Sequence, residues 1–424
     1  MIIPSIDIMD GQAVQLIGGR ERALEAGDPL AVAERFAVVG DLAVIDLDAA
    51  LGRGSNTEVI AELVRRYPCR VGGGIRSVEA ALDWLDRGAQ RVILGTMANP
   101  EVLSRLPRER VMAALDGVDG EVVVEGWQRG TGASVLDRLQ ELKDLVGSFL
   151  VTFVEREGRL GGIDLEAARR VVEAAEGTPV TVAGGVTTAE DVAALDGLGA
   201  DAQVGLAIYT GKLSLADAFA APLTSDRPDG LWPTVVVDDL GVALGLVYSS
   251  AESLRAAVEQ RRGIYQSRSR GLWVKGETSG SVQELVRIDA DCDRDALRFV
   301  VRQQGSGFCH LGTRGCWSDD AGLGALERRV TDRVAESPAD SYTARLLADR
   351  ELLAAKLIEE AGELADASSH RDTIWEAADL LYFTAAALAD RGVGLSEVMA
   401  ELDRRSLATR RRDGSRTFDE GTES

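Results

Sequence analysis

An internal repeat in the first half of the chain constrains its fold most. The segment RVGGGIRSVEAALDWLDRGAQRVILGT begins at Arg70, and TVAGGVTTAEDVAALDGLGADAQVGLA begins at Thr181, about 110 residues later. Each indicates a β-rich run, a glycine turn, an amphipathic helix and a second apolar strand that ends in glycine. The acidic turns IDIMDG, with Asp7, and LDGVDG, with Asp116, repeat at nearly the same spacing.

Strand-like runs alternate with helix-like segments from Met1 to about Ala220. The eight runs are MIIPSIDI, LAVIDLD, CRVGGG, RVILG, VMAALD, FLVTFVE, PVTVAGG and AQVGL. Eight parallel strands in roughly 220 residues fit a (β/α)8 barrel, and a repeat of half that length predicts two four-strand halves.

The chemistry of such a barrel lies at the carboxyl ends of its strands. Asp7 ends the first strand and Asp116 ends the fifth, so the two carboxylates face each other across the mouth and suit general acid–base catalysis. Glycine turns offer backbone N–H groups to phosphate, once in each half, which predicts a substrate with a phosphate at each end. The predicted phosphate-binding residues are Gly73, Gly74, Arg76, Gly95, Gly184, Gly185 and Gly205.

Residues 1–220 resemble ProFAR isomerase of histidine biosynthesis, on the motifs IIPSIDIMDGQAVQL, VIDLDAALGRGSN, VGGGIRS, ALDG, VVVEGWQ and AGGV. The resemblance implies an Amadori rearrangement of an aminoaldose to an aminoketose, with Asp7 as base, Asp116 as acid and Trp127 near the substrate. Two segments depart from the family pattern: Glu157-Gly158-Arg159 stands in place of Asp-Gly-Thr, and Leu206 stands where a basic residue is common.

A second region follows the linker APLTSDRPDGLWP. Its strand-like runs TVVVDD, VALGLVYS, LWVKGE, LVRIDADC and ALRFVVRQ predict a small domain of about 90 residues that is α+β or all-β. Asp291, Asp293 and Asp295 alternate along a segment predicted to be extended, so their oxygens suit Mg²⁺. The thiolates of Cys292, Cys309 and Cys316 suit a catalytic Zn²⁺, and whether His310 is a ligand stays open.

This region resembles phosphoribosyl-AMP cyclohydrolase, on the motifs RPDGL, GLVYSS, YQSRSR, WVKGETSG, DADCDRDA and GFCHLGTRGC. The resemblance implies hydrolysis of an adenine ring by zinc-activated water. It also implies that the three cysteines bind zinc, one of them from the other subunit of a homodimer, and that the three aspartates bind magnesium. Lys275 is then expected to face a substrate phosphate.

The last region is predicted to be helical from about Ala325. The run LLADRELLAAKLIEEAGELADAS has helical apolar periodicity and carries Glu359, Glu360 and Glu363, while WEAADLLYF carries Glu376 and Asp379. Antiparallel packing of the two helices would gather these carboxylates, and such a cluster needs a cation, which predicts Mg²⁺ for a di- or triphosphate substrate.

The EExxE and ExxD spacing resembles the all-α nucleotide pyrophosphohydrolases, and phosphoribosyl-ATP pyrophosphatase in particular. The predicted architecture is therefore a (β/α)8 isomerase-like barrel (1–222), a small α+β zinc domain of cyclohydrolase type (223–322) and an all-α pyrophosphohydrolase domain (323–424), whose tail from about Arg404 is expected to be flexible.

The three resemblances name consecutive steps of histidine biosynthesis, which predicts a multifunctional enzyme acting on phosphoribosyl nucleotides. A net charge of −22 argues against nucleic acid or membrane as a partner, and no apolar run could cross a bilayer, so a cytoplasmic location is expected. One alternative is a bifunctional cyclohydrolase–pyrophosphatase with an inactive, structural barrel, which the changes at Glu157 and Leu206 motivate. Another is a general nucleotide pyrophosphohydrolase.

Overall fold

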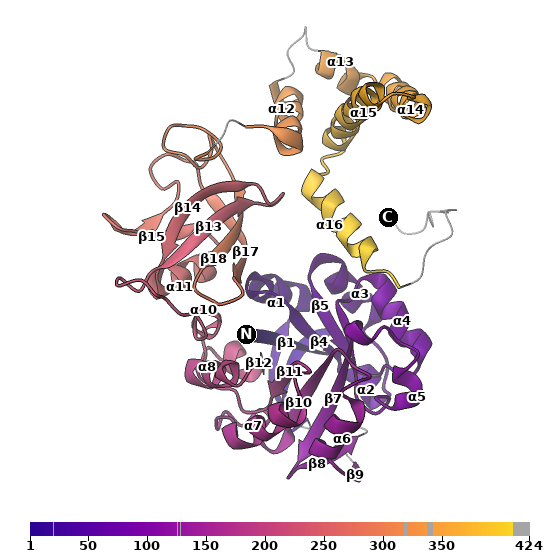
Figure 1. Cartoon of the computed structure of the whole chain (residues 1–424), viewed down its shortest axis with the longest axis vertical. Coiled ribbons are helices and arrows are strands. Elements are labelled where there is room, and N and C mark those ends of the chain that lie inside the picture. The colour runs from indigo at the N-terminus through magenta and orange to yellow at the C-terminus, as the bar shows by residue number, and fades with distance from the viewer. Residues whose placement is uncertain (20, 125, 128, 318–319, 337–341, 410–424) are drawn as a thin grey trace.

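A computed structural model describes residues 1–409, apart from 20, 125, 128, 318–319 and 337–341. Residues 410–424, which belong to the predicted tail, lie outside the described residues. Along the chain, a barrel is followed by a smaller region built on a sheet and then by a group of helices (Figure 1).

Eight parallel strands close into the barrel, which confirms the predicted (β/α)8 architecture of the first region. Each strand pairs with the next, and the last pairs with the first, for example Ile2 with Ala202. In chain order they are β1 (Ile2–Met9), β4 (Leu42–Asp46), β5 (Cys69–Gly72), β6 (Arg91–Leu94), β7 (Val111–Val118), β10 (Ser148–Phe153), β11 (Val180–Ala183) and β12 (Ala200–Val204).

Helices cover the outside of the barrel, and α4 (Val78–Arg87) shows why they form. It buries Val78, Ala81 and Leu85 at helical spacing, and Ser77 caps its first turn. The others are α1 (Pro29–Phe36), α2 (Leu47–Leu51), α3 (Thr57–Arg66), α5 (Pro100–Leu103), α6 (Val135–Leu142), α7 (Leu165–Ala174), α8 (Ala189–Gly197), α9 (Leu206–Tyr209) and α10 (Leu215–Ala220), with short 3-10 turns η1 (Ala37–Val39), η2 (Arg108–Arg110) and η3 (Val154–Arg156).

Two antiparallel extensions mark the repeat in space, and the sequence did not predict them. β2 (Gln12–Ile17) and β3 (Glu21–Gly27) continue from β1, while β8 (Glu121–Val124) and β9 (Arg129–Ser134) continue from β7. Since β1 and β7 each open one set of four barrel strands, the barrel has the predicted two halves.

The second region contains a four-stranded sheet in the order β14–β13–β18–β17 and a separate hairpin, β15–β16. Tyr265 and Phe299, both fully buried, bring hairpin and sheet together with ring centroids 5.4 Å apart. The elements are β13 (Trp232–Asp238), β14 (Ala243–Ser249), α11 (Ala251–Gln260), β15 (Ile264–Ser267), β16 (Gly271–Val274), β17 (Gln283–Ala290) and β18 (Leu297–Gln303).

The third region consists of helices in its described residues. A small core holds it together, made by Val330, Leu346, Leu353, Phe383 and Ala386. The helices are α12 (Gly322–Glu336), α13 (Tyr342–Ala348), α14 (Arg350–Asp366), α15 (His370–Asp390) and α16 (Leu395–Ser406). No helix among the described residues is both long and apolar enough to span a membrane.

The helix α16 returns to the barrel (Figure 1). The Arg404 guanidinium donates to the Arg87 carbonyl at 3.2 Å, and Arg110 donates to the Leu407 carbonyl at 2.7 Å. Arg404, where a flexible tail was expected to begin, is thus part of a helix that contacts the barrel. Arg87 ends α4, so the contact lies near the amino ends of the strands.

The second region attaches to the same face of the barrel. Arg261, just after α11, donates to the carbonyl of Glu34 in the last turn of α1 at 3.0 Å. Arg294 pairs with Asp196 near the end of α8. Both barrel partners lie toward the amino ends of the strands, opposite the mouth, where we expect the chemistry.

Candidate active sites

The two repeated aspartates line one cavity of about 980 Å³ at the barrel mouth. Asp7 lies on β1 and Asp116 on β7, four strands apart in either direction around the barrel. Burial raises the pKa of Asp7 to about 6, although the Ser5 hydroxyl donates to its Oδ1 at 3.0 Å. Burial also raises the pKa of Asp116, against hydrogen bonds from Thr152 and Trp127 that lower it.

A third carboxylate, Glu157, lines the same cavity and was not predicted as a site residue. Burial, followed by the charges of Asp7 and Asp116, raises its pKa to about 7. The sequence signal was present, because Glu157 follows the sixth barrel strand within a few residues, where catalytic groups of this fold lie. In the sequence, Glu157 stands out only as a departure from the family pattern.

The backbone after Glu157 is fixed against the first half of the barrel. The Glu157 carbonyl accepts from the Gly18 N–H at 3.2 Å. A Cβ on Gly158 would lie 2.6 Å from the Leu16 carbonyl oxygen, and its φ of +70° is one that L-residues rarely adopt. Glycine is therefore required here, and it sets the close approach of this loop to the hairpin β2–β3.

The two glycine turns face the cavity from opposite halves. Gly74 and Gly185 both have positive φ. A Cβ added to Gly74 would lie 2.4 Å from the Cβ of Ala49, and a Cβ added to Gly185 would lie 2.5 Å from the Gly162 carbonyl oxygen. All seven barrel residues predicted to bind phosphate line the cavity: Gly73, Gly74, Arg76, Gly95, Gly184, Gly185 and Gly205. Backbone N–H groups in such turns can hold phosphate oxygens.

Trp127 forms part of the cavity wall and is held in an unusual conformation. Its φ is +66°, and its ring packs so closely on Gly19 that a Cβ there would lie 2.5 Å from it. The indole also hydrogen-bonds Asp116. This flat ring beside the carboxylates could stack on a planar group of a ligand.

In the second region, Cys309 and Cys316 come together on the loop after β18. Their thiols interact, and a hydrogen bond from the Leu311 N–H lowers the pKa of Cys309. The Nδ1 of His310 lies 3.9 Å from the Cys309 sulfur. Cys292, on the loop after β17, joins no group of three ligands among the described residues. Two neighbouring thiols fit part of a Zn²⁺ site and leave room for ligands from elsewhere.

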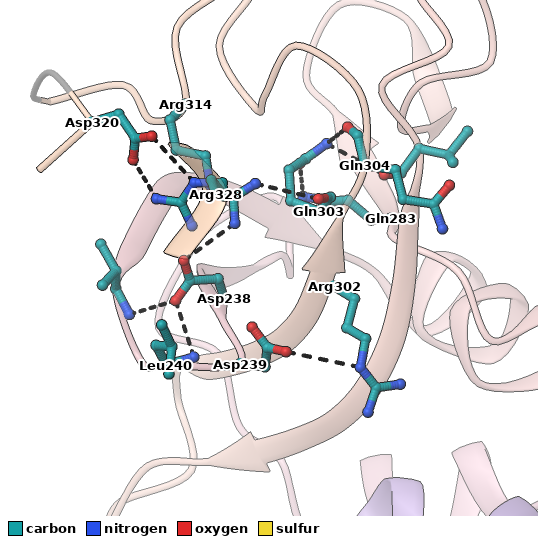
Figure 2. A network of polar contacts seen from close by, with 12 residues as sticks. Asp238, Asp239, Leu240, Gln283, Arg302, Gln303, Gln304, Arg314, Asp320 and Arg328 are labelled. Atoms are coloured by element: carbon teal, nitrogen blue, oxygen red, sulfur yellow. Dashed lines mark hydrogen bonds and ion pairs between the residues drawn. The ribbon is translucent and has the colours of Figure 1, made fainter. Parts of the chain in front are cut away.

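Arg314 anchors this cysteine loop to the sheet (Figure 2). Its guanidinium donates to the Asp238 carboxylate at 3.3 Å and to the Gln303 carbonyl at 3.2 Å. Lys275 lies buried nearby, with its ammonium 5.5 Å from the centre of the Phe308 ring. Burial lowers the pKa of Lys275.

Asp291, Asp293 and Asp295 bring one oxygen each within 4.8 Å of one another. The prediction of an extended segment here was wrong, because β17 ends at Ala290 and Arg294 has a φ of +65°. The Asp291 carboxylate accepts from the N–H of Asp295 at 3.1 Å and folds the loop back. Three converging oxygen donors fit the preference of Mg²⁺.

In the third region, Glu360 and Glu363 of α14 meet Glu376 of α15, with one oxygen of each within 4.8 Å of the others. Burial and then the charge of Glu363 raise the pKa of Glu360 and of Glu376, and the charge of Asp379 contributes to both. Glu359 instead pairs with Lys356 at 2.8 Å. The carboxylate donor set fits Mg²⁺.

Three family models match consecutive parts of the chain. The model for histidine biosynthesis proteins matches residues 1–214. The model for phosphoribosyl-AMP cyclohydrolase matches residues 245–318. The model for phosphoribosyl-ATP pyrophosphohydrolase matches residues 323–406.

Curated relatives show the same composite character. A histidine biosynthesis trifunctional protein of Neurospora crassa is 39% identical over 351 residues, which cover 80% of this chain and 37% of the relative. A histidine biosynthesis bifunctional protein of Schizosaccharomyces pombe is 51% identical over 48% of this chain and 49% of its own. The chain thus spans less than half of either. A phosphoribosyl imidazole-4-carboxamide isomerase of Methanocorpusculum labreanum is 41% identical over 52% of this chain and 98% of its own.

Proposed function

Because the chain belongs to the histidine biosynthesis protein family, we propose that it carries three activities of that pathway. The helical region releases pyrophosphate from phosphoribosyl-ATP, the second region opens the adenine ring of phosphoribosyl-AMP to give ProFAR, and the barrel isomerises ProFAR. The proposed domains are residues 1–222, 223–322 and 323–424. The order of the three family models along the chain supports this division.

The observation that carries the isomerase proposal is the cavity with Asp7, Asp116 and both glycine turns in its wall. Two phosphate cradles would hold a substrate with a phosphate at each end, so that its sugar lies between the carboxylates. Asp7, ionised above pH 6, takes the proton from C2 of the sugar. This transfer follows ring opening, in which a carboxylic acid on the other side protonates the ring oxygen and C1 becomes an imine. The enaminol left by loss of the C2 proton is then protonated at C1, and its C2 hydroxyl gives up a proton to become the ketone.

Asp116 and Glu157 are both candidates for that acid. Each lines the cavity, and burial raises the pKa of each, to about 7 for Glu157, which favours the protonated form that an acid needs. Asp116→Asn and Glu157→Gln separate them, because the true donor loses turnover while the other variant changes chiefly the affinity for ProFAR.

For the second region we propose Cys292, Cys309 and Cys316 as zinc ligands and Asp291, Asp293 and Asp295 as magnesium ligands. Zinc would supply activated water for ring opening. Since Cys292 does not join the other two thiols within the described chain, a homodimer in which one subunit completes the site of the other is part of the proposal. We also propose a cytoplasmic location, because cysteines that bind zinc must stay reduced and the cytoplasm keeps thiols reduced.

For the helical region we propose that Mg²⁺ is held by Glu360, Glu363 and Glu376, with Asp379 beside them. The bound ion would neutralise the phosphate chain of the substrate. The carboxylates would orient this ion and the attacking water.

One experiment tests the whole proposal. Purified full-length chain receives phosphoribosyl-ATP with Mg²⁺ and Zn²⁺, and the products are followed by chromatography. We expect pyrophosphate, then ProFAR, then the ketose. Accumulation of ProFAR without ketose would show that the barrel is inactive. Faster hydrolysis of ordinary nucleoside triphosphates would instead identify a general pyrophosphohydrolase.

A further inference from the structure

The loop that carries Asp291, Asp293 and Asp295 is tied to the barrel through Arg294. Its guanidinium forms an ion pair with Asp196 near the end of α8, and only 29% of the Arg294 side chain and 11% of the Asp196 side chain are exposed. The Arg294 carbonyl also accepts from the N–H of Thr224, in the linker, at 2.9 Å. One residue of the loop is thus held at both its side chain and its backbone.

Arg294 lies at the centre of the acidic loop, where the backbone conformation is least favourable. It lies between two of the three aspartates, and its φ of +65° is a left-handed conformation that a residue with a Cβ adopts at a cost. The three carboxylates bring one oxygen each within 4.8 Å of one another, so their negative charges repel. Such a loop tends to open unless contacts outside it, or a cation within it, hold it together.

We propose that Arg294 is a positioning residue through which the barrel holds this loop ready for a divalent cation, with Asp196 as its partner. The inference rests on the proposed magnesium site at the three aspartates. The ion pair restricts the loop before the cation arrives, so less conformational freedom is lost on binding. The barrel then supports the chemistry of the neighbouring domain in addition to its own.

The test is hydrogen–deuterium exchange of the full-length chain during a Mg²⁺ titration, read from peptides covering residues 288–297. The N–H groups of Asp295 and Ala296 donate to the Asp291 carboxylate and report on the closed loop. This readout is local, so magnesium bound by the helical region does not obscure it. It also does not require the enzyme to be active.

Asp196→Asn removes the ion pair with Arg294 without changing the loop sequence. We expect the N–H groups of the loop to exchange faster in the absence of metal, and the Mg²⁺ concentration at the midpoint of the titration to rise about fivefold. Asp196→Glu keeps the charge and should restore the midpoint. Asp217→Asn is the matched control, because Asp217 of the barrel also pairs with an arginine of the second region, Arg255 at 2.7 Å, but this arginine is not part of the loop. It should leave the midpoint unchanged, even where both Asn variants lower the melting temperature.

Asp196 also pairs with the Met1 amino group at 3.1 Å, so Arg294→Asn is needed as a second variant. Asparagine tolerates positive φ, and we expect the same midpoint shift as in Asp196→Asn. A shift in Asp196→Asn alone would overturn the proposal, and so would equal midpoints in all variants. If the wild-type peptides do not respond to Mg²⁺ at all, the magnesium site itself is refuted.

Discussion

The barrel mouth and the helix pair α14–α15 each gather three carboxylates, but the barrel cluster is enclosed and the helical cluster is only partly buried. Asp7, Asp116 and Glu157 line a cavity, and burial is the largest cause of their raised pKa values, about 6 for Asp7 and about 7 for Glu157. In the helical cluster Glu360 is buried but Glu363 is exposed, and the Lys356 ammonium lies 3.7 Å from the Glu360 carboxylate.

The difference shows two ways in which a protein can tolerate neighbouring acids. In an enclosed site the repulsion is relieved by retained protons, and the acids become proton carriers near neutral pH. In the helical cluster, which is partly open, a lysine lies close by and a bound cation can offset the remaining charge. The same residue types therefore predict acid–base chemistry in the barrel and metal-dependent chemistry on the helices.

Chelation should separate the two sites most strongly. We expect EDTA to reduce pyrophosphate release and ring opening to background, because both are proposed to need bound metal. Isomerisation of added ProFAR should change by less than about twofold, since proton transfer between carboxylates needs no metal. Adding back Mg²⁺ alone should restore pyrophosphate release. Loss of isomerisation on chelation would contradict the comparison.

Asp7→Asn should lower the rate of ProFAR isomerisation by about 10³-fold, within the range of general acid–base contributions. Pyrophosphate release by the same protein should be unaffected. Asp10→Asn is the matched control, because Asp10 lies in the same turn but is exposed and pairs with Arg22 at 3.5 Å. Equal activity of both variants would exclude Asp7 as the base.

The pH dependence should also differ between the sites. The base Asp7 must be ionised, and its pKa is raised to about 6, so it is protonated at pH 5, where an ordinary aspartate is ionised. We expect the isomerisation rate to fall about tenfold per unit below pH 6. Pyrophosphate release, measured in parallel at saturating Mg²⁺, should lack this limb. A flat isomerase profile down to pH 5 would argue against an enclosed base.

Of these changes, Ser5→Ala should have the smallest effect on isomerisation. Without the hydroxyl that donates to Asp7, ionised Asp7 is less stable, and the acid limb of isomerisation should move up by about one pH unit. The rate at pH 8 should barely change. Thr152→Val removes a donor to Asp116 instead and should leave that limb in place. If the acid limb of the isomerisation profile moved equally in both variants, the shift could not be assigned to the hydrogen bond between Ser5 and Asp7.

The periodicity of the sequence predicted the eight barrel strands because each is a short, buried apolar run bounded by turn residues. It missed β3 and β9, whose residues ERALEAG and RGTGAS are largely exposed and lack apolar alternation. β1 and β7 extend beyond the barrel and pair with β2 and β8, which in turn offer the edges on which β3 and β9 form.

Some site residues could likewise be predicted from the sequence, and others could not. Asp7 and Asp116 could be predicted, because a repeat fixes their places on two equivalent strands. The contribution of Glu157 depends on burial and on charges that are distant in sequence, so its pKa cannot be read from neighbouring residues. The ion pair between Arg294 and Asp196 joins two domains, and no local pattern marks it.

The attachment of both later regions to the amino-terminal face leaves the opening of the barrel on the other side of the molecule. ProFAR made in the second region would then have to enter the surrounding solution and travel around the barrel before it could be isomerised. Unlabelled ProFAR added in excess should therefore dilute the label that passes from phosphoribosyl-ATP into the ketose. If the proposed activities are joined in this chain, we expect the fusion to keep their amounts equal, while the intermediate moves between the sites by diffusion.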